Sequence, residues 1–436
     1  MFPKARAKEN IVIANPGKHH FYHIARAVQE VDHAYSFITG FYAKTSGCVY
    51  KSIEKKFSSE QIKERRESTL DERQVVSLWW LEGLYRTFQK SKIGKHLFKE
   101  IAYLRAFDLI TSIHAKKSII FHGSNGCCLR SLRTAKKNGA ITILDQKTLH
   151  PIEWGKIVKE EEDRLGLSNS IFQPNSSQIA SEECDVADIV FVPTLDVYKT
   201  CLLAGVPKDK IIIIPYGVDS SKFRPGLKSD SIFRILYVGN INAHKGLQYL
   251  LEAYREANIK DSELLLIGSI YEPFKRILSR YKGLFRHITY IPNSLLVDYY
   301  TNASIFVMPS LGESWGLATH EAMACGIPIV TTENARGCVE DNISGFVVPI
   351  KDAVALKEKI VYLYENKDLI KEMGAAARKA VETTSWENYR KRIFSVYQYI
   401  LDEIREGRLP IDPTAASQYS ESFHKTRESM QKASGS

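Results

Sequence analysis

Short apolar runs alternate with amphipathic stretches along the first half of the chain. The run at residues 11–14 is closed by turn residues at 15–17, and residues 23–30 then show the spacing of a helix. Similar runs recur at 118–121, 140–144 and 189–192, each followed by sequence compatible with a helix. Because a helix between two strands connects parallel neighbours, this alternation predicts a parallel α/β sheet.

A second series of the same kind follows. The run at 211–214 ends the first series, and the next begins at 234–239. It continues with strand-like segments at 263–268, 287–291, 305–308 and 328–331. We therefore expect an α/β protein of two Rossmann-like domains, with residues 1–215 in the first and 216–385 in the second.

Two segments depart from this alternation. Residues 51–110 are charged at first and then rich in aromatic and basic residues, including Trp79 and Trp80. They predict helices buried against the first sheet; the alternative is a surface for a lipid-linked or anionic acceptor. Residues 386–407 predict a C-terminal helix that packs back toward the first domain, and the polar residues 408–436 predict a disordered tail.

Composition adds a preference for anionic partners. The chain has 436 residues, 44% of them apolar, 25% charged, and a formal net charge of +10. These are globular values, and the positive charge suits a nucleic acid, an acidic membrane surface or a phosphorylated small molecule. Charge alone does not choose among the three.

Cysteine usage and hydropathy indicate the compartment. Seven cysteines are scattered without metal-ligand or CxxC spacing, which suits free thiols in a reducing compartment. No run of 18 apolar residues and no apolar signal core occurs. We expect a cytoplasmic protein, with peripheral attachment to the cytosolic face of a membrane left open.

The strongest chemical signal lies in residues 309–328. A strand is predicted to end at this point, and after a polar loop a helix begins near Gly316. Ligands of open α/β sheets bind at the carboxyl ends of strands, and a helix N-terminus attracts a diphosphate. The carboxylates of Glu313 and Glu321 could then reach different parts of one extended ligand. The turn between them would add further contacts from Ser314, Trp315, Gly316 and Leu317.

A second loop, residues 239–246, follows the first strand of the second domain. Gly239 permits close approach of the backbone, Lys245 supplies a cation for phosphate, and Gly246 ends the loop as a further candidate contact. Asn240 lies in the same loop. The loop is expected to contact the same ligand as Glu313.

The Glu313, seven residues, Glu321 spacing after Pro-Ser, together with the 239–246 loop, resembles the signature of family 4 retaining glycosyltransferases, which have the GT-B fold. The resemblance is strong from about residue 182 to 388 and diffuse before it. It implies two Rossmann-like domains facing across a cleft. It also implies that Glu313 contacts the transferred sugar and that Glu321 binds the ribose hydroxyls. The family usually has arginine where this chain has Asn240.

The same resemblance indicates residues of the first domain. Gly17 stands where the family keeps a flexible loop near the donor phosphates, although an ordinary turn explains it equally well. His122 and Asp145 end successive predicted strands and are candidate catalytic groups on the acceptor side of the cleft. A structural role for His122 is the alternative, and the family often has histidine where this chain has Asp145.

Together these features predict a retaining glycosyltransferase. No Asp-x-Asp triplet occurs, so we expect a metal-independent reaction without a cofactor. The resemblance implies a nucleotide-sugar donor, with UDP- or GDP-sugars foremost, and a saccharide or lipid-linked acceptor; no nucleic acid is expected. The alternatives are a sugar-nucleotide epimerase of the same shape, and a basic protein that binds a membrane surface or nucleic acid.

Overall fold

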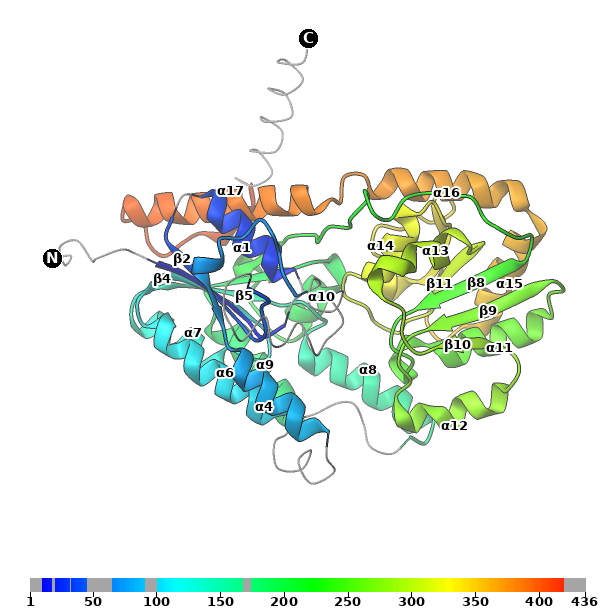
Figure 1. Cartoon of the computed structure of the whole chain (residues 1–436), viewed down its shortest axis with the longest axis horizontal. Coiled ribbons are helices and arrows are strands. Elements are labelled where there is room, and N and C mark those ends of the chain that lie inside the picture. Colours follow the sequence, from blue (N-terminus) through cyan, green and yellow to red (C-terminus); the bar gives the residue numbers. More distant parts are fainter. Residues whose placement is uncertain are drawn as a thin grey trace, which may run out of the picture.

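The computed structural model describes residues 10–17, 20–31, 33–44, 65–90, 100–167 and 174–418. Two α/β domains lie side by side, and one line of helices runs along an edge of both (Figure 1). Each domain is built on a parallel sheet with helices on its faces. This arrangement confirms the predicted α/β class.

The N-terminal sheet has seven parallel strands in the order β3-β2-β1-β4-β5-β6-β7. The order reverses between β1 and β4, so the loops at the carboxyl ends of these strands diverge and leave room for a ligand. The strands are β1 (Asn10–Asn15), β2 (Tyr35–Thr39), β3 (Val75–Ser77), β4 (Ser118–Ser124), β5 (Ile141–Asp145), β6 (Ile189–Val192) and β7 (Ile211–Ile213).

Alternate residues of these strands enter two separate hydrophobic cores. Ile11 and Ile13 of β1 pack toward α1 (Phe21–Glu30) and α17 (Trp386–Arg405), whereas Val12 and Ala14 pack on the opposite face. Burial on both faces explains why the strands are almost wholly apolar. The remaining helices of this domain are α4 (Trp79–Gln89), α6 (Glu100–Ala115), α7 (Leu129–Lys137), α8 (Pro151–Arg164), α9 (Pro174–Val186) and α10 (Leu195–Leu203).

The C-terminal sheet has six parallel strands in the order β10-β9-β8-β11-β12-β13. Its order reverses between β8 and β11, which places the loops after these two strands at the switch point. The strands are β8 (Phe233–Val238), β9 (Ser262–Ile267), β10 (Arg286–Ile288), β11 (Ile305–Met308), β12 (Ile329–Thr332) and β13 (Gly345–Val348). The helices are α11 (Leu247–Ala257), α12 (Lys275–Leu278), α13 (Leu296–Thr301), α14 (Leu317–Ala324), α15 (Ala353–Glu365) and α16 (Lys367–Val381).

The chain crosses between the domains twice. The first crossing follows β7, and the second joins α16 to α17, which returns to pack on α1 (Figure 1). The two crossings touch: the amide of Val218 donates to the carbonyl of Thr384 at 2.8 Å. A Cβ on Gly217 would lie 2.3 Å from the backbone nitrogen of Trp386, so glycine is required for this contact.

Three strands, the exposure of two tryptophans and the packing of the C-terminal residues differ from the sequence-based prediction. Strands β2, β3 and β13 were not predicted. Trp79 and Trp80 are 38% and 45% exposed, because α4 buries its opposite side against the sheet. Ordered packing also continues past residue 408, since Ile411 and Ala416 are buried in the core around α17; residues 419–436 lie outside the described part.

None of the helices in the described residues has the length and apolar character that crossing a bilayer requires.

Candidate functional site

Two loops of the C-terminal domain interlock where β8 and β11 end. The amide of Leu311 donates to the carbonyl of His244 at 2.9 Å. Gly246 has φ +70°, and a Cβ there would lie 1.9 Å from the carbonyl oxygen of Pro309. Only glycine fits this position, because both its dihedral angle and the close approach exclude a side chain. The loops therefore form one rigid edge.

Lys245 and Glu313 meet on this edge. The ammonium group of Lys245 donates to the carboxylate of Glu313 in an ion pair whose two side chains are 16% and 17% exposed. The second carboxylate oxygen of Glu313 accepts from the amide of Ser314 at 3.2 Å. The sequence-based prediction that these loops share one ligand site agrees with this pairing, although their contact with a ligand stays a prediction.

The N-terminus of α14 follows Glu313 closely in the sequence, and polar groups without hydrogen-bond partners surround it. Gly316 caps the helix at φ +66°, and the indole of Trp315 stacks on the imidazole of His320 with ring centroids 4.1 Å apart. Burial lowers the pKa of His320 to about 4, so its ring is neutral at pH 7.

Three buried atoms around this turn have no hydrogen-bond partner among the described residues: Trp315 Nε1, Thr319 Oγ1 and His320 Nε2. Buried polar atoms in native proteins are almost always satisfied. Leu317, the first residue of the helix, is 47% exposed. The N–H groups of the helix start and the indole N–H of Trp315 are donors that suit an anionic ligand. Nε2 of the neutral His320 ring is an acceptor, because Nδ1 donates to the carbonyl of Gly316 at 3.0 Å.

Glu321 lies one turn deeper in α14 than this group. Its carboxylate accepts from the hydroxyl of Tyr300 at 2.8 Å. Burial raises the pKa of Glu321 to about 7, against the lowering effects of the Tyr300 hydrogen bond and the charge of Lys222. Glu321 thus binds a proton more readily than an exposed glutamate does.

Asn240 is exposed and lies at the rim of the same loop. Its side-chain oxygen accepts from the hydroxyl of Ser269 at 2.9 Å, and its carbonyl accepts from Tyr237 at 2.7 Å. Gly239, with φ +153°, lies directly before it and against Gly268. The position offers a neutral amide where an arginine would offer charge.

The Glu313 loop also contacts the N-terminal domain. The hydroxyl of Ser314 donates to the carbonyl of Lys147 at 2.6 Å. A Cβ added to Gly312 would lie 2.6 Å from Leu149, so these residues are already packed together. The carboxyl edges of the two sheets therefore meet around Glu313.

On the N-terminal side, Asp145 forms the centre of a buried cluster. Its carboxylate accepts from His20 Nε2 and from the hydroxyl of Tyr216, both at 2.9 Å. Burial alone would raise the pKa of Asp145, but the charge and hydrogen bond of His20 and the hydrogen bond of Tyr216 outweigh it and hold the pKa below its usual value. Asp145 thus stays ionised.

His122 lies within the core of the domain and is not on a cleft surface. Its side chain is fully buried, and Nδ1 lies 2.9 Å from the hydroxyl of Tyr397 in α17. Nε2 lies 4.0 Å from Asp145 and has no hydrogen-bond partner among the described residues. Burial lowers the pKa of His122 to about 4. The sequence expectation of a cleft residue is corrected, because β4 continues to Ser124 and the His122 ring packs inside the sheet's cover, between Phe21 of α1 and Tyr397 of α17.

Gly17 also has a local role, since its carbonyl accepts from Asn15 Nδ2 at 2.7 Å and closes the turn after β1. His20 and Tyr216 were not predicted as site residues. His20 stacks on Tyr216 with centroids 4.1 Å apart, and Tyr216 lies 6.2 Å from the ring of Trp315. The rings therefore connect Asp145 to the Glu313 loop.

Known proteins resemble the chain in sequence and in structure. Residues 232–366 match the family model described as "Glycosyl transferases group 1". The D-inositol 3-phosphate glycosyltransferase of Paenarthrobacter aurescens is 30% identical over 207 residues, which cover 42% of this chain and 50% of that protein. The capsular polysaccharide biosynthesis glycosyltransferase CapM of Staphylococcus aureus is 32% identical over 189 residues, or 40% and 48% of the two chains.

Solved structures match over a greater length. Sucrose-phosphate synthase of Thermosynechococcus elongatus superposes with a TM-score of 0.63 at 18% identity, covering 91% of this chain and all of that one. HepE of Anabaena, solved with UDP and glucose, gives 0.60 at 14% identity and covers 89% and 99%.

The structure has the GT-B architecture of these glycosyltransferases, which confirms the predicted fold. The family model covers the part of the C-terminal domain that holds Lys245, Glu313 and Glu321. The chain spans about half the length of the curated relatives that it matches.

Proposed function

We propose that the protein is a retaining, metal-independent glycosyltransferase. It transfers a sugar from a nucleotide diphosphate sugar, with UDP- or GDP-sugars foremost, to a saccharide or lipid-linked acceptor. The observation that carries this proposal is the Lys245–Glu313 ion pair, which lies at the carboxyl edge of the C-terminal sheet and directly precedes the N-terminus of α14. The glycosyltransferase relatives and the UDP complex of a structural neighbour support it.

The donor diphosphate would bind between Lys245 and the first turn of α14. Negative charge accumulates on the diphosphate as the glycosidic bond breaks, so a cation and a helix dipole stabilise the transition state more than the ground state. Lys245 then exchanges Glu313 for phosphate, which frees the Glu313 carboxylate for hydroxyls of the sugar. Glu321, which lies deeper in the helix, would bind the ribose hydroxyls.

The acceptor would enter from the N-terminal domain, on the face that the nucleotide leaves, so that the anomeric configuration is retained. Ionised Asp145 orients His20 and Tyr216, whose rings extend toward Trp315. We assign this cluster a positioning role, because its polar groups are already engaged with one another. His122 supports the cluster from the α17 side.

A sugar-nucleotide epimerase would use the same cleft without an acceptor. The names of the relatives, which are glycosyltransferases of inositol phosphate and capsular polysaccharide, favour transfer. No observation on the site favours epimerisation.

The test is a two-part assay on the full chain. Thermal stabilisation by UDP-, GDP- and ADP-sugars identifies the donor, because a ligand that binds the native state raises the melting temperature. The donor that stabilises is then incubated with saccharide and lipid-linked acceptors, with and without EDTA. We expect glycosylated product of retained configuration in both conditions. Epimerised donor without acceptor product, or turnover that EDTA abolishes and manganese restores, would contradict the corresponding part of the proposal.

A further inference from the structure

An exposed apolar face runs along α4. Leu81 and Glu82 are buried toward the sheet, whereas Trp79, Trp80 and Leu84 are 38%, 45% and 50% exposed. Trp80 and Leu84 are four residues apart and so lie on one side of the helix. Large aromatic side chains exposed in a row are unusual on a soluble surface.

The neighbouring helix α6 repeats the pattern. Leu109 and Ile113 are 47% and 65% exposed and follow exposed Arg105 at intervals of four residues. The buried side of α6 includes Phe107 and Thr111. One stripe of this helix therefore faces away from the core.

The two stripes belong to the same layer. Tyr85 of α4 stacks on Tyr103 of α6 with ring centroids 4.8 Å apart, so the helices are direct neighbours. On the other flank of α6, Asp108 accepts from the amides of Arg130 and Ser131 in α7. Figure 1 shows α4 and α7 on the two flanks of α6. Arg105, Leu109 and Ile113 are exposed, so this stripe faces away from both helices and from the sheet.

Positive charge borders the apolar residues. Exposed Lys90 follows α4, and exposed Lys116 and Lys117 follow α6. Within residues 79–90 and 100–117, Glu82 and Asp108 are buried, which leaves Glu100 as the exposed acidic side chain. Aromatic and aliphatic groups beside lysines and an arginine are the composition of a helix that lies in the interface of an anionic bilayer.

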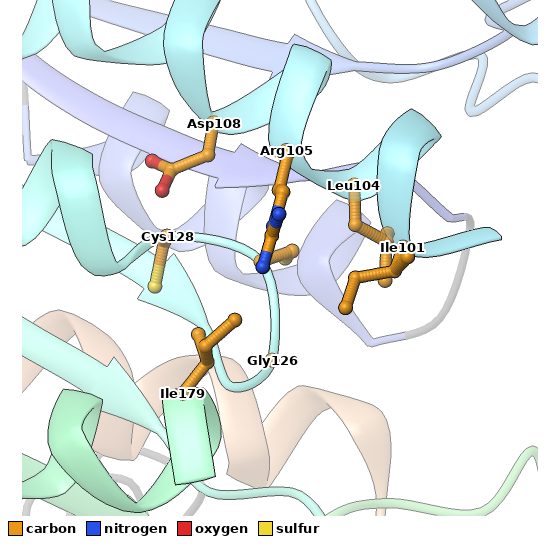
Figure 2. Close-up of a pocket in the computed structure, with 8 residues that line it drawn as sticks. Ile101, Leu104, Arg105, Asp108, Gly126, Cys128 and Ile179 are labelled. Atoms are coloured by element: carbon orange, nitrogen blue, oxygen red, sulfur yellow. The ribbon is translucent and has the colours of Figure 1, made fainter. Parts of the chain in front are cut away.

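Figure 2 shows how Arg105 lies on this layer. Its side chain extends from α6 toward the loop at Gly126, across a hollow that Ile101 and Leu104 border on one side and Ile179 on the other. The hollow measures about 30 Å³, which holds one water molecule and no larger ligand. Among the described residues Arg105 forms no ion pair, so its charge is available at the surface.

The start of α4 lies at the carboxyl edge of the N-terminal sheet. The amide of Leu78 donates to the carbonyl of Thr39 at the end of β2, and Glu82 accepts from the amide of Phe41 at 2.6 Å. Trp79 and Trp80 therefore border the same edge of the sheet as Asp145. A bilayer on this layer would lie next to the acceptor side of the cleft.

We propose that the outer face of α4 and α6, formed by Trp79, Trp80, Leu84, Arg105, Leu109 and Ile113 with Lys90, Lys116 and Lys117, docks on an anionic lipid membrane. The apolar residues enter the headgroup boundary, and the basic residues attract the negative surface. This attachment goes beyond glycosyl transfer and is measurable without a donor.

The test is co-sedimentation of the full chain with vesicles. Wild-type protein should bind vesicles of equal parts phosphatidylcholine and phosphatidylserine, bind pure phosphatidylcholine poorly, and lose binding at high salt. The double substitution Trp80→Ser, Leu84→Ser should lower binding about tenfold or more. Arg105→Gln with Lys116→Gln should lower it about fivefold for each charge removed.

Matched controls use the C-terminal domain. Tyr290→Ser with Ile343→Ser removes apolar groups that are 61% and 56% exposed, and Lys282→Gln with Lys367→Gln removes the same charge. Both controls should bind like wild type, with thermal melting as the check on folding. The proposal is overturned if wild type does not co-sediment with the anionic vesicles or binds neutral vesicles equally well. It is also overturned if the control substitutions weaken binding as much as the α4 and α6 substitutions do. Loss of vesicle binding with intact transfer to a soluble acceptor would leave the proposed function unaffected.

Discussion

The two edges of the interdomain contact are built differently. On the C-terminal edge, the charged side chains come from two short loops. Lys245 and Glu313 form an ion pair there at a partly exposed position. On the N-terminal edge, Asp145 is almost fully buried and takes its partners from residues 125 and 71 positions away. One edge holds its charged groups at a partly exposed position, whereas the other buries its charge among hydrogen bonds.

This contrast predicts different consequences of mutation. Substitutions of the partly exposed Lys245 and Glu313 should alter donor kinetics and leave the melting temperature near that of wild type. Substitutions in the Asp145 cluster should lower stability first.

The largest effect should come from Glu313→Ala. If the carboxylate supports the reacting sugar, its loss should lower kcat about a hundredfold and change the donor KM little. Glu321→Ala, eight residues on, should mainly raise the donor KM. Steady-state kinetics of both variants check this, and equal effects on both parameters in both variants would contradict the division of roles.

Lys245→Ala should follow closely. A hydrogen bond to a charged group contributes about 1.5–3 kcal/mol, so kcat/KM should fall about ten- to a hundredfold. Part of the loss should be in kcat, since the leaving diphosphate gains charge in the transition state. A folded Lys245→Ala protein with wild-type kinetics would show that the 239–246 loop does not bind the phosphates.

Asp145→Asn tests the opposite edge. The pKa of Asp145 is lowered, so its ionised form stabilises the fold above about pH 4 and this contribution disappears as the pH falls below that value. The substitution should cost about 1–3 kcal/mol of unfolding free energy at pH 7 and less at pH 3. Thermal melting at the two pH values measures it. An unchanged melting temperature together with a raised donor KM would contradict the structural role of Asp145 and would assign it to donor binding instead.

Glu321→Gln should stabilise the protein at alkaline pH. The pKa of Glu321 is raised to about 7, so the native state loses stability as the pH rises from the ordinary carboxyl range through 7. Glutamine keeps an acceptor for Tyr300 without the buried charge, so unfolding at pH 8 should require about 1–3 kcal/mol more than in wild type, and at pH 5 the two proteins should agree. Melting curves that differ equally at both pH values would contradict this.

The smallest effect should come from Asn240→Arg. A bidentate contact with phosphate would tighten donor binding several-fold, about 1 kcal/mol, because Asn240 is exposed at the rim of the loop. Asn240→Ala should cost less than Lys245→Ala. Donor affinity by calorimetry distinguishes these variants, and weaker binding in Asn240→Arg would show that the loop does not direct this residue toward the donor.

The same contrast explains what the sequence could predict. The apolar runs predicted both parallel sheets, because buried strands are recognisable from their own residues. Strands β2 and β13 escaped prediction because one mixes polar with apolar residues and the other begins at Gly345. Glu313 and Lys245 lie in local motifs, so their loops could be recognised from spacing. His20 and Tyr216 could not, because only the register of the folded sheet brings them to Asp145.

The doubled crossing between the domains has a mechanical consequence. A single covalent thread would let one domain swivel about the other in any direction. Here two threads are fastened by the Val218 amide and the Thr384 carbonyl, with Gly217 pressed against Trp386. Rotation of one domain about the linkage would wind the two crossings around each other. A bending motion, in contrast, displaces both crossings in the same direction. We therefore expect the two domains to open and close by bending about the linkage, and the linkage to restrict their rotation relative to each other.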